Sequence, residues 1–204
     1  MVAPVNERRI ARPMSPKHRA RPRKPVAKAT RGFNLVELML TLSIASVLVG
    51  LAVPSFQGIM QDSRRSTVVN AFVHSVFVAR SSAITYNRTV SICRSVDGAT
   101  CSNHTASWEH GWIVFMNGDR DDPPAIDRGE HILFVQHALP GAAITSNRRA
   151  YSFRSYAHAV VNGTVVFCDR RGSTEARAVI INTAGRTRVS NRDSDSRPLR
   201  CPNG

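Results

Sequence analysis

A single apolar run constrains this chain more than any other feature of its sequence. Residues 35–53 read Leu-Val-Glu-Leu-Met-Leu-Thr-Leu-Ser-Ile-Ala-Ser-Val-Leu-Val-Gly-Leu-Ala-Val, and with Phe33 and Asn34 the stretch spans 21 residues. About 20 consecutive apolar residues are needed for a helix to cross the hydrocarbon core of a bilayer. We therefore expect a membrane-spanning helix over residues 33–53, and the charges in the rest of the sequence exclude a second span.

The distribution of basic residues predicts the orientation of this helix. The chain has 28 Lys and Arg against 14 Asp and Glu, a net charge of +14, and ten of the basic residues lie within residues 1–32 with one acid. Positive charge before a membrane span stays on the cytoplasmic side. The N-terminus should therefore be inside and the residues after about 54 outside, in the periplasm. Most of the net charge belongs to this leading segment, so it does not by itself indicate nucleic-acid binding.

An ordinary secretory signal peptide fits the apolar run poorly. Its cleavage site would fall at Ala52-Val53-Pro54-Ser55, where Pro54 is unfavourable for cleavage. The run also contains Glu37, and a carboxylate inside a membrane segment is costly unless it has a function or a partner. Pro54 and Gly58 then interrupt the helical pattern, and Pro54 is expected to kink the helix because it removes one backbone donor and clashes with the preceding turn.

The junction between the basic segment and the apolar run resembles the cleavage motif of type IV pilins and type II secretion pseudopilins, on the residues Arg31-Gly32-Phe33-Asn34-Leu35-Val36-Glu37-Leu38. The resemblance implies that a prepilin peptidase cuts after Gly32, that Phe33 becomes N-methylated, and that Glu37 is the assembly residue. Pro54 lies where this family commonly carries a proline. The leader is longer than in many members, and Met1 and Met14 are both candidate starts.

A physical reason supports the assembly role of Glu37. A subunit that leaves the bilayer for a filament would bury this carboxylate among apolar helices, where an unpaired charge is costly and a paired one is tolerated. The resemblance implies that the amine of Phe33 on a neighbouring subunit is the partner. The alternative is that Glu37 only lies near the lipid headgroups.

The sequence after Pro54 predicts one helix followed by strands. Apolar residues recur with helical spacing from Phe56 to Ile84, and this amphipathic helix should end near Tyr86. Turn signals such as Asp97-Gly98 and Asn117-Gly118 then separate short β-type runs. The expected strands are 89–94, 111–116, 131–137, 150–154, 164–168, 177–183 and 186–190. This order predicts an α+β, pilin-like fold, with a long N-terminal helix packed on an antiparallel sheet or β-sandwich. The expected domains are a leader (1–32), a transmembrane helix (33–53) and a periplasmic domain (54–204).

The later runs narrow the resemblance to the GspH/FimT branch of this family. They are Gly111-Trp112-Ile113-Val114-Phe115, Gly163-Thr164-Val165-Val166-Phe167-Cys168 and Gly185-Arg186-Thr187-Arg188. The branch contains minor pseudopilins of type II secretion and minor pilins of type IV pili, some linked to DNA uptake, and the sequence does not choose between these systems. The resemblance implies assembly with other pilins, in few copies near the filament tip, and contact with a prepilin peptidase and the inner membrane.

Four cysteines follow the membrane segment, and the predicted orientation places them in an oxidising compartment. Three pairings are possible. We favour Cys93–Cys101, which closes a short loop, with Cys168–Cys201, which ties the C-terminal tail to a strand and resembles the C-terminal disulfide loop of many pilins. Zinc is the alternative, but the spacing Cys-x-x-Cys does not occur.

Arginines in the C-terminal third form a candidate DNA-binding surface. Residues 146–204 hold 11 Arg and 4 acids. Arg186 and Arg188 alternate on an expected strand after Gly185, so both should point to one face, and the run resembles the Gly-Arg-x-Arg motif linked to DNA binding in FimT-type pilins. Arg148, Arg149 and Arg192 are further candidates. Binding through phosphates would not be sequence-specific. The alternative is a solvated arginine-rich face on a purely structural pseudopilin.

Other groups predict little chemistry. The acid-rich loop Asn117–Asp122, with Asp127 and Glu130, could hold calcium, but it is not an EF-hand and a solvated hairpin loop fits better. The sequence shows no catalytic motif and none that binds a cofactor, so we expect no enzyme activity, no cofactor and no metal.

Overall fold

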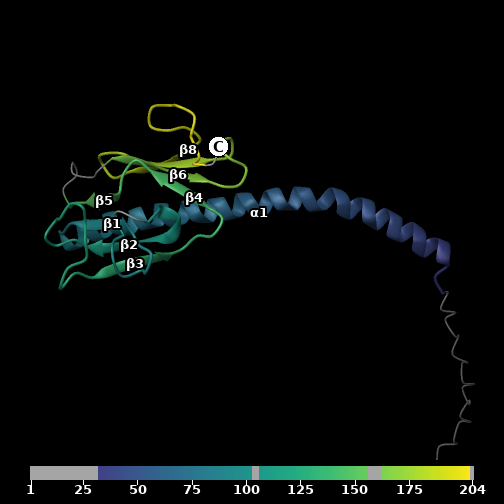
Figure 1. Cartoon of the computed structure of the whole chain (residues 1–204), viewed down its shortest axis with the longest axis horizontal. Helices are drawn as coiled ribbons and strands as arrows, with labels where there is room; N and C mark the ends of the chain where they lie inside the picture. Colours follow the sequence, from purple (N-terminus) through teal and green to yellow (C-terminus); the bar gives the residue numbers. More distant parts are fainter. Residues whose placement is uncertain (1–31, 103–105, 156–161, 203–204) are drawn as a thin grey trace, which may run out of the picture. The chain divides into compact units, whose positions relative to one another are not determined.

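A computed structural model describes residues 32–102, 106–155 and 162–202. The chain divides into two compact units, Met1–Ser46 and Val47–Gly204. Helix α1 (Leu35–Tyr86) begins in the first unit and continues into the second, and every strand among the described residues belongs to the second unit (Figure 1). The expected leader, residues 1–32, lies outside the described residues apart from Gly32.

The first part of α1 carries the apolar run. Every described side chain from Phe33 to Val53 is exposed, and α1 is long and apolar enough to cross a membrane by length and composition. Backbone helix continues across Pro54 and Gly58. The side chain of Pro54 lies outside the described residues, so its kink stays a prediction. The end of α1 at Tyr86 agrees with the predicted end of the amphipathic helix.

Two four-stranded antiparallel sheets follow α1 (Figure 1). The first, sheet A, has the strand order β3-β2-β1-β5, and the second, sheet B, has the order β4-β6-β7-β8. Sheet A consists of β1 (Val90–Arg94), β2 (Gly111–Met116), β3 (Ile132–His137) and β5 (Ala150–Phe153), and sheet B of β4 (Ala143–Ser146), β6 (Gly163–Cys168), β7 (Arg177–Ile181) and β8 (Thr187–Ser190). A short 3₁₀ helix, Trp108–His110, precedes β2.

The second part of α1 and the inner faces of both sheets share one hydrophobic core. Phe72 of α1 lies at its centre, fully buried, with its ring 5.4 to 6.1 Å from the rings of Trp108, Trp112, Tyr151 and Phe167. Apolar residues three and four positions apart on α1 supply one stripe of this core, because such residues share a face of a helix. The stripe is Val68, Val69, Phe72, Val76, Ala79 and Ala83.

Smaller apolar clusters cover the outer faces of the sheets, and each contains a disulfide. Cys93–Cys101 adjoins Ile113 and Phe115 on sheet A, and Cys168–Cys201 adjoins Ile180 and Leu199 on sheet B. These are the same pairs that the sequence favours, and all four cysteines are engaged. The second disulfide holds the C-terminal segment against sheet B.

The fold is the α+β arrangement that the sequence predicts, with one strand more. The expected strands correspond to β1, β2, β3, β5, β6, β7 and β8 within one or two residues. The sequence missed β4, which has four residues, begins with alanine and pairs on one side only, with β6.

Candidate functional site

The N-terminal end of α1 places Glu37 in the first helical turn, on an otherwise apolar surface. The side-chain oxygen of Asn34 accepts a hydrogen bond of 3.4 Å from the backbone N–H of Val36, and its carbonyl accepts one of 3.0 Å from Leu38. Asn34 thus acts as an N-cap, a position that asparagine favours. Phe33 is 82% exposed and Glu37 is exposed. Within the described residues, no hydrogen bond or ion pair is formed by the Glu37 carboxylate.

A tight turn between β7 and β8 positions Arg186 and Arg188. The side-chain oxygen of Asn182 accepts hydrogen bonds from the backbone N–H groups of Ala184 (3.0 Å) and Arg186 (2.9 Å). Gly185 adopts φ 71°, a left-handed conformation that glycine permits. Both arginines are exposed, and the pairing of Arg188 with Ile180 places Arg188 on the outer side of sheet B. Arg188 therefore lies on the edge strand β8 (Thr187–Ser190), whereas Arg186, which the sequence predicted on the same strand, lies in the turn just before it.

Arg148 and Arg149 lie at the same end of sheet B, on its opposite edge. They follow β4, and the row Asn147, Thr164, Ile180 and Arg188 crosses the sheet from β4 to β8. Neighbouring strands of a sheet lie about 4.8 Å apart, so the two edge strands β4 and β8 are about 14 Å from each other. The Nε of Arg148 donates a hydrogen bond of 3.0 Å to the carbonyl of Asn162. The two predicted pairs thus lie at one end of one sheet without direct contact between strands β4 and β8.

Arg192 does not join this group. It lies beyond the other end of β8, after Ser190, which pairs with Ala178. Its guanidinium donates a hydrogen bond of 2.9 Å to the carbonyl of Ser196. The backbone of Arg192 also forms an isolated antiparallel β-bridge with that of Pro198 in the C-terminal segment. The structure therefore assigns Arg192 a contact within this segment, which sequence spacing alone did not reveal.

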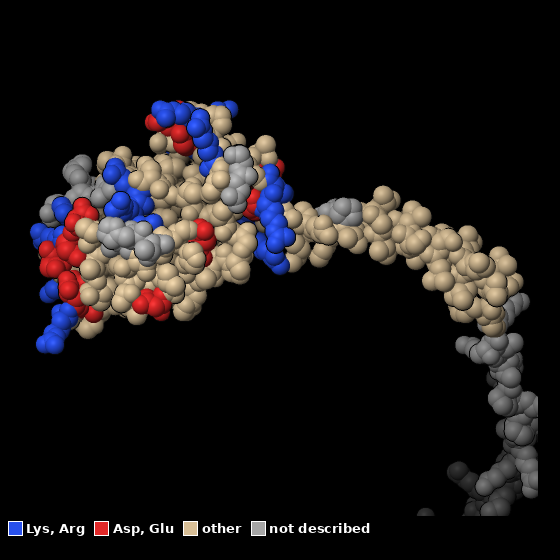
Figure 2. Space-filling model, viewed as in Figure 1, with Lys and Arg blue, Asp and Glu red and all other residues tan. Residues whose placement is uncertain are grey.

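The structure places further basic residues beside Arg148 and Arg149, and two of them, Arg94 and Arg120, were not among the arginines that the sequence assigned to this surface. A groove of about 700 Å³ runs beside β5 and is lined by Arg120 and Arg154 together with Arg148 and Arg149. Arg94 lies near Arg149. Burial lowers the pKa of the Arg94 guanidinium most, and the positive charge of Arg149 lowers it further. Figure 2 shows basic side chains at this end of the domain beside acidic ones. Only the tertiary pairing of β1 with β5 brings Arg94 to this end.

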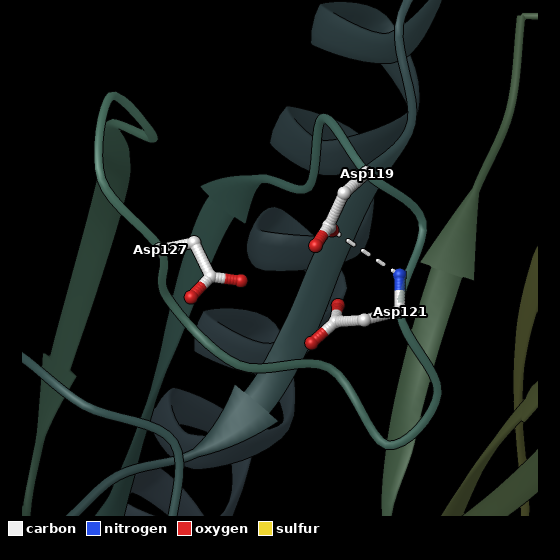
Figure 3. A group of neighbouring side chains, drawn as sticks. All are labelled: Asp119, Asp121 and Asp127. Carbon is white, nitrogen blue, oxygen red and sulfur yellow. Dashed lines mark hydrogen bonds between the residues drawn. The ribbon is translucent and has the colours of Figure 1, made fainter.

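The acid-rich loop gathers three carboxylates, those of Asp119, Asp121 and Asp127, whose oxygens lie within 4.8 Å of one another (Figure 3). Burial, and then the neighbouring carboxylates, raise the pKa of Asp121 and of Asp127. The carboxylate of Asp121 also accepts a hydrogen bond of 2.7 Å from the backbone N–H of Ala125, and that of Asp119 accepts one of 3.3 Å from Asp121. Through these hydrogen bonds, the carboxylates of Asp119 and Asp121 hold the backbone of the loop in place.

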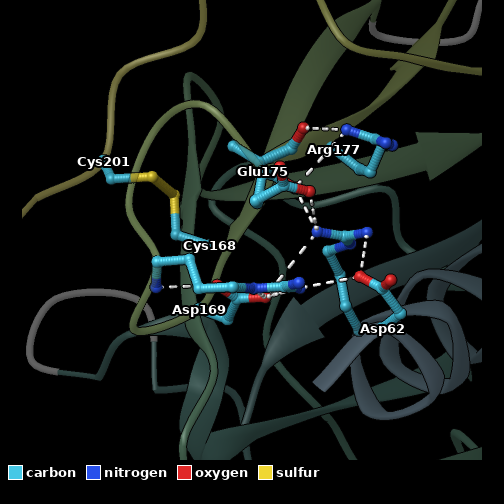
Figure 4. Close-up of polar contacts among 9 residues, drawn as sticks. Asp62, Cys168, Asp169, Glu175, Arg177 and Cys201 are labelled. Atoms are coloured by element: carbon cyan, nitrogen blue, oxygen red, sulfur yellow. Dashed lines mark hydrogen bonds and ion pairs between the residues drawn. A yellow bond between two sulfur atoms is a disulfide. The ribbon is translucent and has the colours of Figure 1, made fainter. Parts of the chain in front are cut away.

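A network of ion pairs ties α1 to the β6–β7 loop (Figure 4). Arg171 lies 2.8 Å from Asp62 of α1 and 2.6 Å from Asp169, and Arg65 lies 3.3 Å from Glu175. Hydrogen bonds from Arg171 lower the pKa of both Asp62 and Asp169. The network adjoins the Cys168–Cys201 disulfide and was not visible in the sequence, because its two sides, on α1 and on the β6–β7 loop, are more than 100 residues apart.

The exposed apolar start of α1, with two antiparallel sheets packed on its second part, defines a pilin-like α+β protein. Residues 68–185 match the family model described as type II transport protein GspH, which covers more than half of the chain. The chain belongs to this family of pilins and pseudopilins, which is structural in role.

Solved structures show weaker likenesses. The type IV minor pilin FimU of Pseudomonas aeruginosa is 16% identical, with a TM-score of 0.49 over 70% of this chain and 98% of that chain. A second crystal form of FimU gives 18% identity and a TM-score of 0.46, over 69% of this chain and 98% of that one. The minor pseudopilin EpsH of the Vibrio cholerae type 2 secretion system is 12% identical, with a TM-score of 0.43 over 62% of this chain and 96% of that chain. Comparison with curated proteins gives no match.

Proposed function

We propose that this chain is a minor pilin or pseudopilin that is cut after Gly32, N-methylated at Phe33 and held in the inner membrane by residues 33–53. Its domain, residues 54–204, faces the periplasm until the subunit moves into a filament with other pilins of a type IV pilus or a type II secretion system. The observation that carries this proposal is Glu37, a carboxylate in the first turn of an exposed apolar helix.

Burial of this helix in a filament gives Glu37 its role. The apolar side chains from Leu35 to Val53 gain by packing against other helices, whereas an unpaired carboxylate among them is strongly disfavoured. The new amine of Phe33 on a neighbouring subunit offsets that cost, because it supplies the opposite charge. Only a subunit placed in the matching register makes this pair, so the pair selects correct assembly.

Replacement of Glu37 tests the assembly role. In cells that make the filament, we expect Glu37→Gln to reach the inner membrane in normal amounts but to be depleted from sheared filaments. Glu37→Asp keeps the charge and serves as the matched control. Equal incorporation of Glu37→Gln and the unchanged protein would contradict the pairing role.

A second candidate function is non-specific DNA binding, as in a minor pilin for DNA uptake. The supporting observation is that Arg186 and Arg188 are exposed at the end of sheet B where Arg148 and Arg149 also lie. Within the described residues, no acidic side chain pairs with any of these four guanidinium groups. Guanidinium groups bind phosphate bidentately and keep their charge at physiological pH.

Salt dependence separates this function from the purely structural alternative. We expect the chain that begins at Phe33, in detergent micelles, to bind duplex DNA with a log–log salt slope near −3.6 if about four phosphates are contacted. Arg186→Gln with Arg188→Gln should weaken binding and make the slope shallower by about 1.8. Arg88→Gln with Arg128→Gln, outside sheet B, is the control pair. No binding at low salt would favour the structural pseudopilin.

A further inference from the structure

A cavity of about 140 Å³ lies where α1 meets sheet B, within the second unit of the chain. One wall comes from α1, at Gln61, Arg64, Arg65 and Val68. The opposite wall comes from the β3–β4 loop and the end of β6, and consists of Pro140, Gly141, Ala142, Phe167, Cys168, Asp169 and Arg170. Small-molecule pockets are usually larger than about 300 Å³. This cavity therefore suits a single small group rather than a whole ligand.

Two exposed arginines at this cavity, Arg64 and Arg170, form no hydrogen bond or ion pair among the described residues. The neighbouring arginines do take part in the ion-pair network. Arg65, which is 9% exposed, bonds to Asp62 and Glu175, and Arg171 bonds to Asp62 and Asp169. Because the three acids of the network are already engaged, Arg64 and Arg170 leave the cavity with a positive charge at its rim.

The cavity also contains an acceptor without a donor. The side-chain oxygen Oε1 of Gln61 is buried and, within the described residues, accepts no hydrogen bond. A buried acceptor of this kind costs free energy until a donor reaches it. A group that satisfies the whole cavity must therefore offer both a negative charge for the two guanidinium groups and a hydrogen-bond donor for Gln61.

The distance along α1 places the cavity near the lipid headgroups. The apolar run ends at Val53, and a rise of 1.5 Å per residue places Gln61 about 12 Å and Arg64 about 17 Å further along the helix. Phe56, Ile59 and Met60 are exposed apolar residues in between. Headgroups extend about 5 to 8 Å beyond the hydrocarbon core on each side, and arginine side chains reach toward them from positions above. Figure 2 shows basic side chains gathered where α1 enters the domain.

We propose that this cavity binds the headgroup of an anionic phospholipid, with phosphatidylglycerol as the chemistry that fits. Arg64 and Arg170 hold the phosphodiester, and a glycerol hydroxyl donates to Oε1 of Gln61. This proposal rests on the proposed membrane anchoring of residues 33–53. Its consequence is that the domain is held against the outer surface of the inner membrane before the subunit leaves for a filament.

Hydrogen exchange of the chain in lipid nanodiscs tests the proposal. The full chain is reconstituted in phosphatidylcholine alone or in phosphatidylcholine mixed with phosphatidylglycerol, and exchange is followed in peptides that contain Pro140–Ala142 and Asp169–Gly172. We expect at least threefold slower exchange with phosphatidylglycerol. The slowing should disappear in Arg64→Gln with Arg170→Gln and diminish in Gln61→Met. Arg128→Gln is the matched control, because this exposed arginine lies on the acid-rich loop.

Each other result overturns the proposal in a distinguishable way. Equal exchange in both lipid mixtures, or the same slowing in the double variant, would remove the headgroup site and leave the membrane anchor intact. Slowing by soluble glycerol phosphate in pure phosphatidylcholine would identify a site for free phosphate instead. A chain that does not co-migrate with the nanodiscs would refute the anchoring and, with it, the headgroup site.

Discussion

The indole Nε1 of Trp112 donates a hydrogen bond of 2.8 Å to the side-chain oxygen of Ser75, in the fully buried contact between α1 and β2. Ser75 in turn donates to the carbonyl of Ala71, one helical turn earlier. A buried indole needs such a partner. This bond links α1 to sheet A at one defined position of the helix.

Loss of this bond should destabilise the domain. Ser75→Ala leaves the buried N–H of Trp112 without a partner, so we expect the free energy of unfolding to fall by about 1–3 kcal/mol. Ser81→Ala is the matched control, since the Ser81 hydroxyl bonds only to its own helix at Val78, and it should cost less than about 0.5 kcal/mol. Urea unfolding of the full chain in detergent measures both, and equal effects would contradict the role of the pair.

The ion pairs of Arg171 should make stability depend on pH. Hydrogen bonds from Arg171 lower the pKa of Asp62 and Asp169 in the folded state. When folding lowers the pKa of an aspartate, it adds stability at every pH above the unfolded pKa of about 3.9. This added stability is lost as the pH falls toward and through the pKa of the folded state. Arg171→Gln should therefore destabilise the chain modestly at neutral pH, because solvent screens exposed ion pairs, and progressively less below about pH 4.

The neighbouring residue supplies the control for that experiment. Arg170→Gln removes an exposed charge that has no partner among the described residues, so the pH dependence of unfolding should match that of the unchanged chain. A cost of Arg171→Gln that stays constant down to acidic pH would show that its ion pairs do not set the stability.

The acid-rich loop should behave in the opposite sense. Burial and the carboxylates of Asp119 and Glu130 raise the pKa of Asp127 in the folded state. Stability present below the unfolded pKa is then lost as the pH rises through the folded value. Asp127→Asn should therefore stabilise the chain slightly at neutral pH, with no gain below about pH 4. A thermal unfolding series across pH checks this, and destabilisation at neutral pH would contradict it.

The two disulfides should differ in their contribution to stability. Cys168–Cys201 joins residues 33 positions apart and Cys93–Cys101 joins residues 8 positions apart. Loop-closure entropy then predicts losses of about 3.7 and about 2.5 kcal/mol, respectively, on replacement of each pair by serine. The first replacement should also make the C-terminal segment sensitive to proteases. Equal resistance of this segment in both variants would show that its other contacts suffice to hold it.

Much of the fold could be predicted because its signals are local. Helical spacing gave the end of α1 near Tyr86, and turn residues such as Asn117-Gly118 bounded most strands. Strand β4 was missed because its only β-type residues are Ile144 and Thr145, which stand between the turn signal Pro140-Gly141 and the polar Ser146-Asn147. Local patterns identify an element only when its own residues favour it.

The candidate sites were only partly predictable, because contacts between distant residues carry them. The sequence predicted Arg186 and Arg188 on one strand, but only Arg188 lies in β8, and Arg186 lies in the turn before it. It could not show that Arg192 lies beyond the other end of β8, or that Gln61 and Arg170 line one cavity. These relationships depend on sheet register and on how α1 packs, which no spacing rule supplies.

The N-terminus of the protein isolated from its own cells tests the central claim most directly. Intact-mass and fragment spectra should show a chain that begins at Phe33 and carries one additional methyl group on its amine. The same sample should contain the precursor only when Gly32 is replaced, as in Gly32→Ala. A chain that begins at Met1 or Met14, or one that is cut after the apolar run, would contradict the assignment as a membrane-anchored filament subunit.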